Sequence, residues 1–244
     1  MELKIGIITQ VRATSTRLPA KVLRTAGGRT YLEHHLDRLC ATGLPVIVAT
    51  TTNPDDDPVV HLAEQAGIPV FRGSEEDVLS RFAGATRAHQ LDGIVRVTSD
   101  CPLIDPQVVA EGVDSWQSEK DENLYLSNCL ERTHPRGMDY EVFSAARLLD
   151  ADEQATLPAD REHVTPYLHQ NRPGDIRLRN LPWSGGGSQY RLTLDTPDDQ
   201  KLLEILIEEY GADRLSCAEL VAVLDAHPEL AALNAHIEQK KLGE

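Results

Sequence analysis

Three cationic side chains lie within ten residues of one another near the N-terminus of this chain. They are Arg12, Arg17 and Lys21, and small hydroxyl residues stand between them: Thr14, Ser15 and Thr16. Cations that are grouped in this way are costly to bury without an anion. The net charge of the whole chain is −15, so this positively charged group stands out within an acidic protein. These residue types predict a site for a highly charged anion, most simply a triphosphate.

Two aspartates are candidate ligands for a divalent cation beside such an anion. Asp100 and Asp195 each follow an apolar run that is typical of a short strand. Mg²⁺ usually takes one or two protein carboxylates together with phosphate oxygens and water, although an aspartate before a helix can also serve as its cap. Asp105 is better placed than Asp100 to cap the helix that follows it. The segment DTPDD at 195–199 is itself a cap signature, so the residues alone leave the role of Asp195 open.

A second pair of carboxylates lies farther along the chain. Asp139 and Glu141 are two residues apart, which places them on one face of the strand expected over 137–143. Two like charges on one face are unfavourable unless they meet donors or cations. A solvent-facing edge is one interpretation of this pair. Hydrogen bonding to the hydroxyl groups of an acceptor, or orienting a basic residue, is an equally good one.

Other charged residues have a structural and a functional interpretation as well. The triplet Arg161, Glu162 and His163 lies in an expected helix, where an exposed ion-pair face is the commoner outcome. Three further cations could meet an acidic acceptor: Arg132, Arg136 and Arg191.

The first 110 residues alternate between strand-like and helix-like segments. Strands are expected at 5–11, 46–50, 68–71 and 93–98, and helices at 30–42, 58–66 and 75–90. This alternation predicts a parallel sheet with helices on both faces. The cationic segment follows the carboxyl end of the first strand, which is where open α/β sheets bind ligands.

The pattern changes in the second half of the chain. Strands are expected at 124–127, 137–143, 175–181 and 190–194, and helices at 106–116, 145–154, 157–170, 200–209 and on either side of 227–228. We interpret the chain as one domain, 1–244, which contains three regions. They are a nucleotide-binding half (1–120), an acceptor and dimerisation region (121–190), and a part with Asp195 and the C-terminal helices (191–244).

The composition narrows the class of protein. The chain has 244 residues, of which 41% are hydrophobic, so it can bury a full core. Its four cysteines form no C-x-x-C pair, and neither a secretory signal nor a membrane-spanning apolar run is visible. We therefore expect a cytoplasmic protein. The acidic net charge argues against a nucleic acid polymer or a membrane as its partner.

Several motifs resemble those of the sugar-acid cytidylyltransferases. They are RATSTRLPAK at 12–21, ATTTNPDDDP at 49–58, VFRGSEEDVL at 70–79, DCPLIDP at 100–106, GMDYEVF at 137–143, REHVTPY at 161–167, LTLDTPDD at 192–199 and NAHI at 234–237. The branch that the chain resembles most is the spore-coat polysaccharide type, and related enzymes activate 3-deoxy-octulosonate and neuraminate. The chain departs from its close relatives at Ala13-Thr14 and at Ala20, where they carry Met-Gly and Gly. Glycine lets a backbone approach a phosphate closely, so a different path of this loop is expected.

The resemblance implies a Rossmann-like nucleotidyltransferase fold of the α/β class, with CTP as donor and Mg²⁺ as cofactor. The residues it assigns to the triphosphate are Arg12, Ser15, Thr16, Arg17 and Lys21. The residues it places beside the cytosine and ribose are Arg72, Ser74 and Arg81. The residues it turns toward the acceptor are Asp139, Glu141, Arg161, Glu162 and His163. It makes Asp100 and Asp195 the metal ligands, and catalysis is expected to depend on them together with Arg12 and Lys21.

The expected reaction is the transfer of CMP from CTP to a small acidic acceptor, a sugar acid or a phosphonate, with release of pyrophosphate. A nucleotide-sugar-dependent glycosyltransferase is the first alternative, but the close aspartates at 55–57 and 198–199 are better explained as a loop and a helix cap. A non-catalytic CTP-binding regulatory module is the second. The sequence carries neither a G-x-x-x-x-G-K-[ST] loop nor a G-x-G-x-x-G turn, which argues against a P-loop NTPase and a dinucleotide cofactor. A homodimer is expected because it is the commonest assembly.

Overall fold

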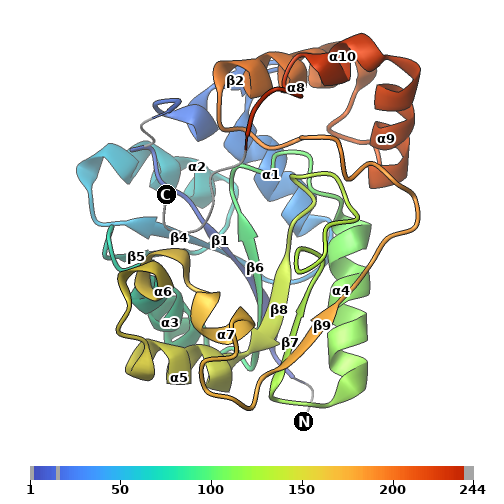
Figure 1. Ribbon diagram of the computed structural model, residues 1–244. Coiled ribbons are helices and arrows are strands. Elements are labelled where there is room, and N and C mark those ends of the chain that lie inside the picture. The colour runs from blue at the N-terminus through green and yellow to red at the C-terminus, as the bar shows by residue number, and fades with distance from the viewer. Residues whose placement is uncertain (1–2, 15–16, 239–244) are drawn as a thin grey trace.

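A computed structural model describes residues 3–14 and 17–238, and its centre is a seven-stranded sheet (Figure 1). The strands are β1 (Ile5–Gln10), β4 (Val46–Thr51), β5 (Val70–Gly73), β6 (Gly93–Thr98), β7 (Leu124–Ser127), β8 (Glu141–Ser144) and β9 (Arg177–Asn180). Their order across the sheet is β5-β4-β1-β6-β8-β7-β9. The four strands of the first half are parallel, as the alternation of the sequence predicts, and β8 is antiparallel to β6 and β7. The strand β9 then pairs with β7 in the parallel sense.

Helices cover both faces of the sheet (Figure 1). One face is covered by α1 (Tyr31–Cys40), α2 (Asp57–Gln65) and α4 (Pro106–Glu119), and the other by α3 (Val78–His89), α5 (Ala145–Gln154), α6 (Pro158–His163) and α7 (Pro166–His169). Successive side chains of a strand point to opposite faces. Ile7 therefore joins the first apolar layer and Ile8 the second, which explains why β1 is a continuous apolar run.

A third apolar cluster lies at the end of the molecule to which β6 points (Figure 1). Its helices are α8 (Pro197–Tyr210), α9 (Cys217–Ala226) and α10 (Pro228–Ala232). Leu192 and Leu194 belong to the same cluster, and so does Leu206 of α8. A short hairpin of β2 (Thr25–Ala26) and β3 (Arg29–Thr30) packs against α8. The C-terminal helices thus stand over the carboxyl end of the sheet, where a ligand is expected.

The structure corrects three elements expected from the sequence. Segment 190–194 is not a strand: it forms a single bridge, between Arg191 and Arg136, because its peptide groups bond to loops on either side. The strand expected over 137–143 begins only at Glu141. The helix expected over 157–170 is broken at Val164, which has φ 71° and ψ −53°, and Thr165 N donates to His163 O across this tight turn at 2.8 Å.

Short elements that the sequence pattern did not reveal complete the fold. Besides the hairpin, two single-turn 3₁₀ helices occur, η1 (Lys21–Leu23) and η2 (Pro54–Asp56). In the part of the chain described here, no helix has both the length and the apolar character needed to cross a lipid bilayer.

Candidate active site

The two aspartates predicted as metal ligands lie together, joined by Lys21. The Lys21 Nζ atom is 3.3 Å from Asp100 Oδ2 and 2.8 Å from Asp195 Oδ1. Asp100 follows the end of β6, and Asp195 comes directly before Thr196, the N-cap of α8. Backbone bonds hold the two segments together, because Asp100 O accepts from Leu194 N at 2.8 Å and from Thr193 Oγ1 at 3.0 Å.

Lys21 and Asp100 stay charged although they are largely enclosed by protein. The Asp195 side chain is 6% exposed and that of Lys21 14%. Burial by itself raises the pKa of Asp100, but Lys21 and a hydrogen bond from Thr98 outweigh it and hold that pKa well below its usual range. Burial in turn lowers the pKa of Lys21, and the two aspartates raise it above its usual value. Lys21 and Asp100 are therefore an ion pair at neutral pH.

The donor set fits a magnesium ion. Asp100 and Asp195 turn carboxylate oxygens toward a shared cation, the Lys21 ammonium, so the space between them already accommodates positive charge. Hard oxygen ligands suit Mg²⁺, which needs only one or two carboxylates when phosphate oxygens complete its shell. No group of three or more His, Cys, Asp or Glu side chains with metal-ligand spacing occurs among the described residues, so nothing there resembles a closed structural zinc site.

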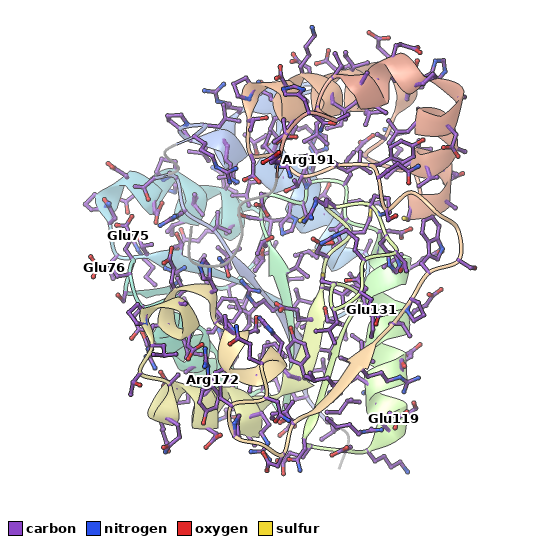
Figure 2. All side chains as sticks on the ribbon, in the orientation of Figure 1. Glu75, Glu76, Glu119, Glu131, Arg172 and Arg191 are labelled. Atoms are coloured by element: carbon purple, nitrogen blue, oxygen red, sulfur yellow. The ribbon has the colours of Figure 1, made fainter. Side chains whose placement is uncertain are left out.

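Asp195 is held from the opposite side by a buried network. Arg191 Nη2 donates to Asp195 Oδ2 at 2.9 Å, and Arg191 Nε donates to Asp199 Oδ1 at 2.8 Å. Asp199 is fully buried and also accepts from Asn234 Nδ2 at 2.8 Å. Figure 2 shows Arg191 between the sheet and the C-terminal helices. The structure thus places Arg191, expected beside the acceptor, against Asp195, the predicted metal ligand.

Asp199 and Asn234 were not among the predicted site residues. Asp199 has the sequence signature of a helix cap, and it does accept from the N-cap residue Thr196. Asn234 lies in the NAHI motif, whose place in the family pattern was the only signal for it. Its connection to Asp199 depends on how the C-terminal segment folds back onto α8.

Carboxylates from two other loops hold the cationic segment 12–21. Asp56 Oδ1 accepts from Ala13 N at 2.7 Å, and Glu75 Oε1 accepts from Thr14 Oγ1 at 2.7 Å. The departure from glycine in this loop therefore supplies a hydroxyl that anchors it, while Arg12 stays exposed.

The rest of the segment closes toward the aspartates. Arg17 Nη2 lies 3.0 Å from Asp195 Oδ1. Ala20 adopts the left-handed conformation, with φ 51° and ψ 32°. Ser15 and Thr16 lie outside the described residues.

The residues expected beside the nucleoside differ in their surroundings. Arg72 of β5 donates to Thr51 O, Asn53 O and Asp57, so its guanidinium ties β5 to the segment that joins β4 to α2. Arg81 is buried and donates from Nη1 to Ser74 O at 2.7 Å, whereas its Nε atom meets no hydrogen-bond partner among the described residues.

The pKa of Arg81 reflects its burial. Burial lowers the pKa of Arg81 to about 10, against the opposing effect of Asp56. It is a buried cation with an unused donor, close to the loop that carries Arg12, which lowers the same pKa.

Asp139 and Glu141 do not share a face, because the strand begins after Asp139. Asp139 accepts two hydrogen bonds from Arg132, at 2.7 and 2.9 Å. Glu141 accepts from Arg96, Tyr125 and Thr165. Burial raises the pKa of Glu141, but these partners outweigh it and keep the pKa below the usual value.

Within the triplet 161–163, Arg161 forms ion pairs that hold neighbouring helices together. Arg161 pairs with Asp77, the N-cap of α3, at 2.6 Å and with Asp152 of α5 at 2.9 Å. Glu162 is exposed and His163 is partly exposed. The described contacts of Arg161 thus join three helices to one another.

The chain is similar in sequence to proteins of one known family. The cytidylyltransferase family matches residues 5–224. The spore coat polysaccharide biosynthesis protein SpsF of Bacillus subtilis is 32% identical over 237 residues, which cover 93% of this chain and 96% of that protein. A 3-deoxy-manno-octulosonate cytidylyltransferase of Yersinia pseudotuberculosis is 30% identical over 113 residues, 44% of each chain.

A solved structure extends the match to three dimensions. A cytidylyltransferase from Leptospira borgpetersenii superimposes with a TM-score of 0.90 at 34% identity and covers 98% of this chain and 100% of its own. The similarity therefore runs through the whole Rossmann-like fold. The chain belongs to the cytidylyltransferase family, whose members are CTP-dependent nucleotidyltransferases.

Proposed function

We propose that this protein transfers CMP from CTP to a small acidic acceptor and releases pyrophosphate, with Mg²⁺ as cofactor. The observation that carries the proposal is the position of Lys21 between Asp100 and Asp195 at the carboxyl end of the sheet. An ammonium and two carboxylates gathered there suit a nucleoside triphosphate and its metal ion. The names of the relatives, a sugar-acid cytidylyltransferase among them, support an acid as the acceptor.

The reaction needs no protein nucleophile. An acceptor oxygen attacks the α-phosphorus of CTP in line, the new P–O bond forms, and the bond to the pyrophosphate oxygen breaks. The proton of an attacking hydroxyl passes to solvent. Catalysis of this kind consists of positioning and of stabilising charge as it moves to the leaving group.

The residues of the site divide this work. Arg12, Arg17 and Lys21 bind the triphosphate and neutralise charge that develops on pyrophosphate. Asp100 and Asp195 would hold the metal ion. When bound, Mg²⁺ supplies Lewis-acid stabilisation of phosphate oxygens and lowers the pKa of the attacking group.

Arg81 is the residue proposed to recognise the base. A buried guanidinium with an unused Nε donor is unfavourable unless a ligand satisfies it. The carbonyl oxygen and ring nitrogen of cytosine are acceptors that match such a donor. UTP, whose ring nitrogen carries a proton at the same place, would match it less well.

The test is release of pyrophosphate from CTP, with Mg²⁺ and a panel of sugar acids and phosphonates. Lys21→Ala and Asp100→Asn are expected to lower turnover by about 10²–10³-fold, in line with other electrostatic stabilisers. Lys201→Ala, a change at an exposed lysine of α8, is the matched control and should leave turnover unchanged. Undiminished turnover in both site variants would refute the assignment.

Two other outcomes would replace the proposal. Transfer of a sugar from a nucleotide sugar without release of pyrophosphate would identify a glycosyltransferase. Tight binding of CTP with no turnover on any acceptor would identify a regulatory module.

A further inference from the structure

Arg136 is fixed by its backbone beside the segment that carries Asp195. Its peptide nitrogen donates to Tyr190 O at 3.0 Å, and its carbonyl oxygen accepts from Leu192 N at 2.7 Å. The next residue, Gly137, has φ 98°, and a Cβ atom there would lie 2.5 Å from Leu192 O. Only glycine allows this close approach, so the backbone at Arg136 has little freedom.

The neighbouring arginines have carboxylate partners. Arg132 donates two parallel hydrogen bonds to Asp139, and Arg191 forms ion pairs with Asp195 and Asp199. The guanidinium of Arg136, in contrast, has neither an ion pair nor a hydrogen bond with any of the residues that the structure describes.

The charge of Arg136 is partly withdrawn from water. The residue is neither fully buried nor exposed. Burial, followed by the positive charge of Arg132, lowers the pKa of Arg136, and Arg191 adds to this effect, while Asp139 opposes it. Three guanidinium groups therefore interact there, and one of them has no anion of its own.

Such an arrangement is unfavourable until an anion binds. A cation that is partly desolvated beside other cations loses hydration and gains repulsion. A surface arginine without function would turn into solvent, where both costs are small. The guanidinium is also the side chain that best matches a planar carboxylate or a phosphonate, through paired hydrogen bonds.

The location connects this cation to the reaction proposed above. Arg136 pairs with Arg191 along the backbone, and Arg191 contacts Asp195 at 2.9 Å. An anion on Arg136 would thus lie near Arg191, which binds the carboxylate that is proposed to hold the metal ion.

We propose that Arg136 binds the anionic group of the acceptor, a carboxylate or a phosphonate, and so selects acids over neutral alcohols. This inference rests on the proposed function, because it concerns the second substrate of the same site. It makes Arg136 a binding residue that determines specificity, and it places the acceptor's charge within a few bonds of its attacking oxygen.

The test is a calorimetric titration of the full chain in the presence of Mg²⁺ and a non-hydrolysable CTP analogue. Two probes distinguish the kind of anion: 3-deoxy-manno-octulosonate carries a carboxylate, and 2-hydroxyethylphosphonate a phosphonate. Arg136→Gln should weaken binding of the preferred probe by about 10- to 100-fold, as expected for loss of a charged hydrogen-bonded contact. Arg136→Lys, which keeps the charge but not the paired geometry, should fall in between.

Two controls make the result specific. Arg214→Gln removes an arginine whose side chain is 88% exposed, and it should bind the probe as the wild type does. The affinity of Arg136→Gln for the CTP analogue should also be unchanged, which shows that the variant is folded and that the nucleotide half is intact.

The outcomes separate this inference from the proposed function. Equal affinity of Arg136→Gln and wild type for the acid, or no binding of either probe to the wild type, would overturn the role of Arg136. If the wild type binds the acid through Arg136 but releases no pyrophosphate in the presence of CTP, the inference about Arg136 stands and the transfer reaction is refuted.

Discussion

Lys21 lies between two carboxylates that would otherwise repel each other. Its loss would remove a proposed ligand of the triphosphate and leave Asp100 and Asp195 to face each other as like charges. Because like charges at close range raise the pKa of at least one carboxyl group, a substitution at this one position disturbs three residues. The expected loss in turnover of Lys21→Ala therefore includes more than one missing contact.

His35 makes the stability of the folded protein depend on pH. It is fully buried, where Nδ1 donates to Cys101 O at 2.9 Å and Nε2 accepts from Thr9 Oγ1 at 2.9 Å, so the neutral ring is satisfied. Burial lowers its pKa from 6.5 to about 4. As pH falls through this window the unfolded chain takes up a proton and the folded chain does not. The free energy of unfolding should therefore decrease by about 3 kcal/mol as pH falls from 6.5 to 4.

Denaturant unfolding at a series of pH values measures this effect. His35→Gln should lose the His35 part of the pH dependence, whatever its stability at neutral pH. His61→Gln, at an exposed histidine of α2, should keep the full slope. An identical slope in His35→Gln and wild type would show that His35 does not titrate in this way.

The turn between the cationic loop and η1 contains a residue in an unfavourable conformation. Ala20 has φ 51°, and the left-handed region costs a residue with a Cβ atom about 1–2 kcal/mol. Glycine avoids this cost but loses more entropy on folding. We expect Ala20→Gly to raise the free energy of unfolding by up to about 1 kcal/mol, measured by denaturant unfolding.

A matched alanine provides the control for this change. Ala41, the C-cap of α1, has φ −66°, which is unstrained, so Ala41→Gly should lower the free energy of unfolding. Equal destabilisation by both substitutions would mean that Ala20 is not strained.

The C-terminal segment supports Asp195, the proposed metal ligand, through Asn234. Asn234→Ala breaks the bond to Asp199, and Asp199 then holds Arg191 and Asp195 less firmly. Loss of an outer-shell partner typically costs about 10–100-fold in metal affinity. We therefore expect weaker Mn²⁺ binding, measured by electron paramagnetic resonance in the presence of CTP.

The same segment offers a control. His236→Ala changes a side chain that is 66% exposed, two residues away, and should leave Mn²⁺ affinity unchanged. Unchanged affinity in Asn234→Ala would limit this residue to a role in packing.

At the scale of the molecule, the candidate site brings together three segments that are far apart in the sequence. Lys21 follows β1, Asp100 follows β6, and Asp195 belongs to the segment that leads into α8 (Figure 1). A ligand that contacts all of them stabilises the folded state as a whole. At a concentration of about 100 times its dissociation constant, CTP with Mg²⁺ should raise the free energy of unfolding by about 2.7 kcal/mol.

Thermal unfolding with and without CTP and Mg²⁺ measures this stabilisation. At the same CTP concentration Asp100→Asn should show a smaller shift of the melting temperature, and Lys201→Ala the same shift as the wild type. A full shift in Asp100→Asn would mean that the nucleotide binds elsewhere.

The parallel half of the sheet and most of its helices can be predicted from the sequence alone. β6 and α5 have the bounds expected from the sequence, because a buried strand needs a continuous apolar run and Ser144 is a strong helix cap. The grouping of Arg12, Arg17 and Lys21 after the first strand is also visible in the sequence, and its role in binding an anion stays a prediction. Strands, helix caps and charged segments depend on residues that are close in sequence, so the sequence pattern can predict them.

Which charged residues face one another depends on how the chain folds and cannot be predicted from their spacing. Asp139 and Glu141 are two residues apart yet bind different arginines, whereas Lys21 and Asp195 come from opposite ends of the chain and lie 2.8 Å apart. The support of Asp195 by Arg191, Asp199 and Asn234, and the lack of a described partner for Arg136, follow likewise from chain folding. The physical reason is that an ion pair depends on distance in space, which sequence spacing does not fix once the segments belong to different layers.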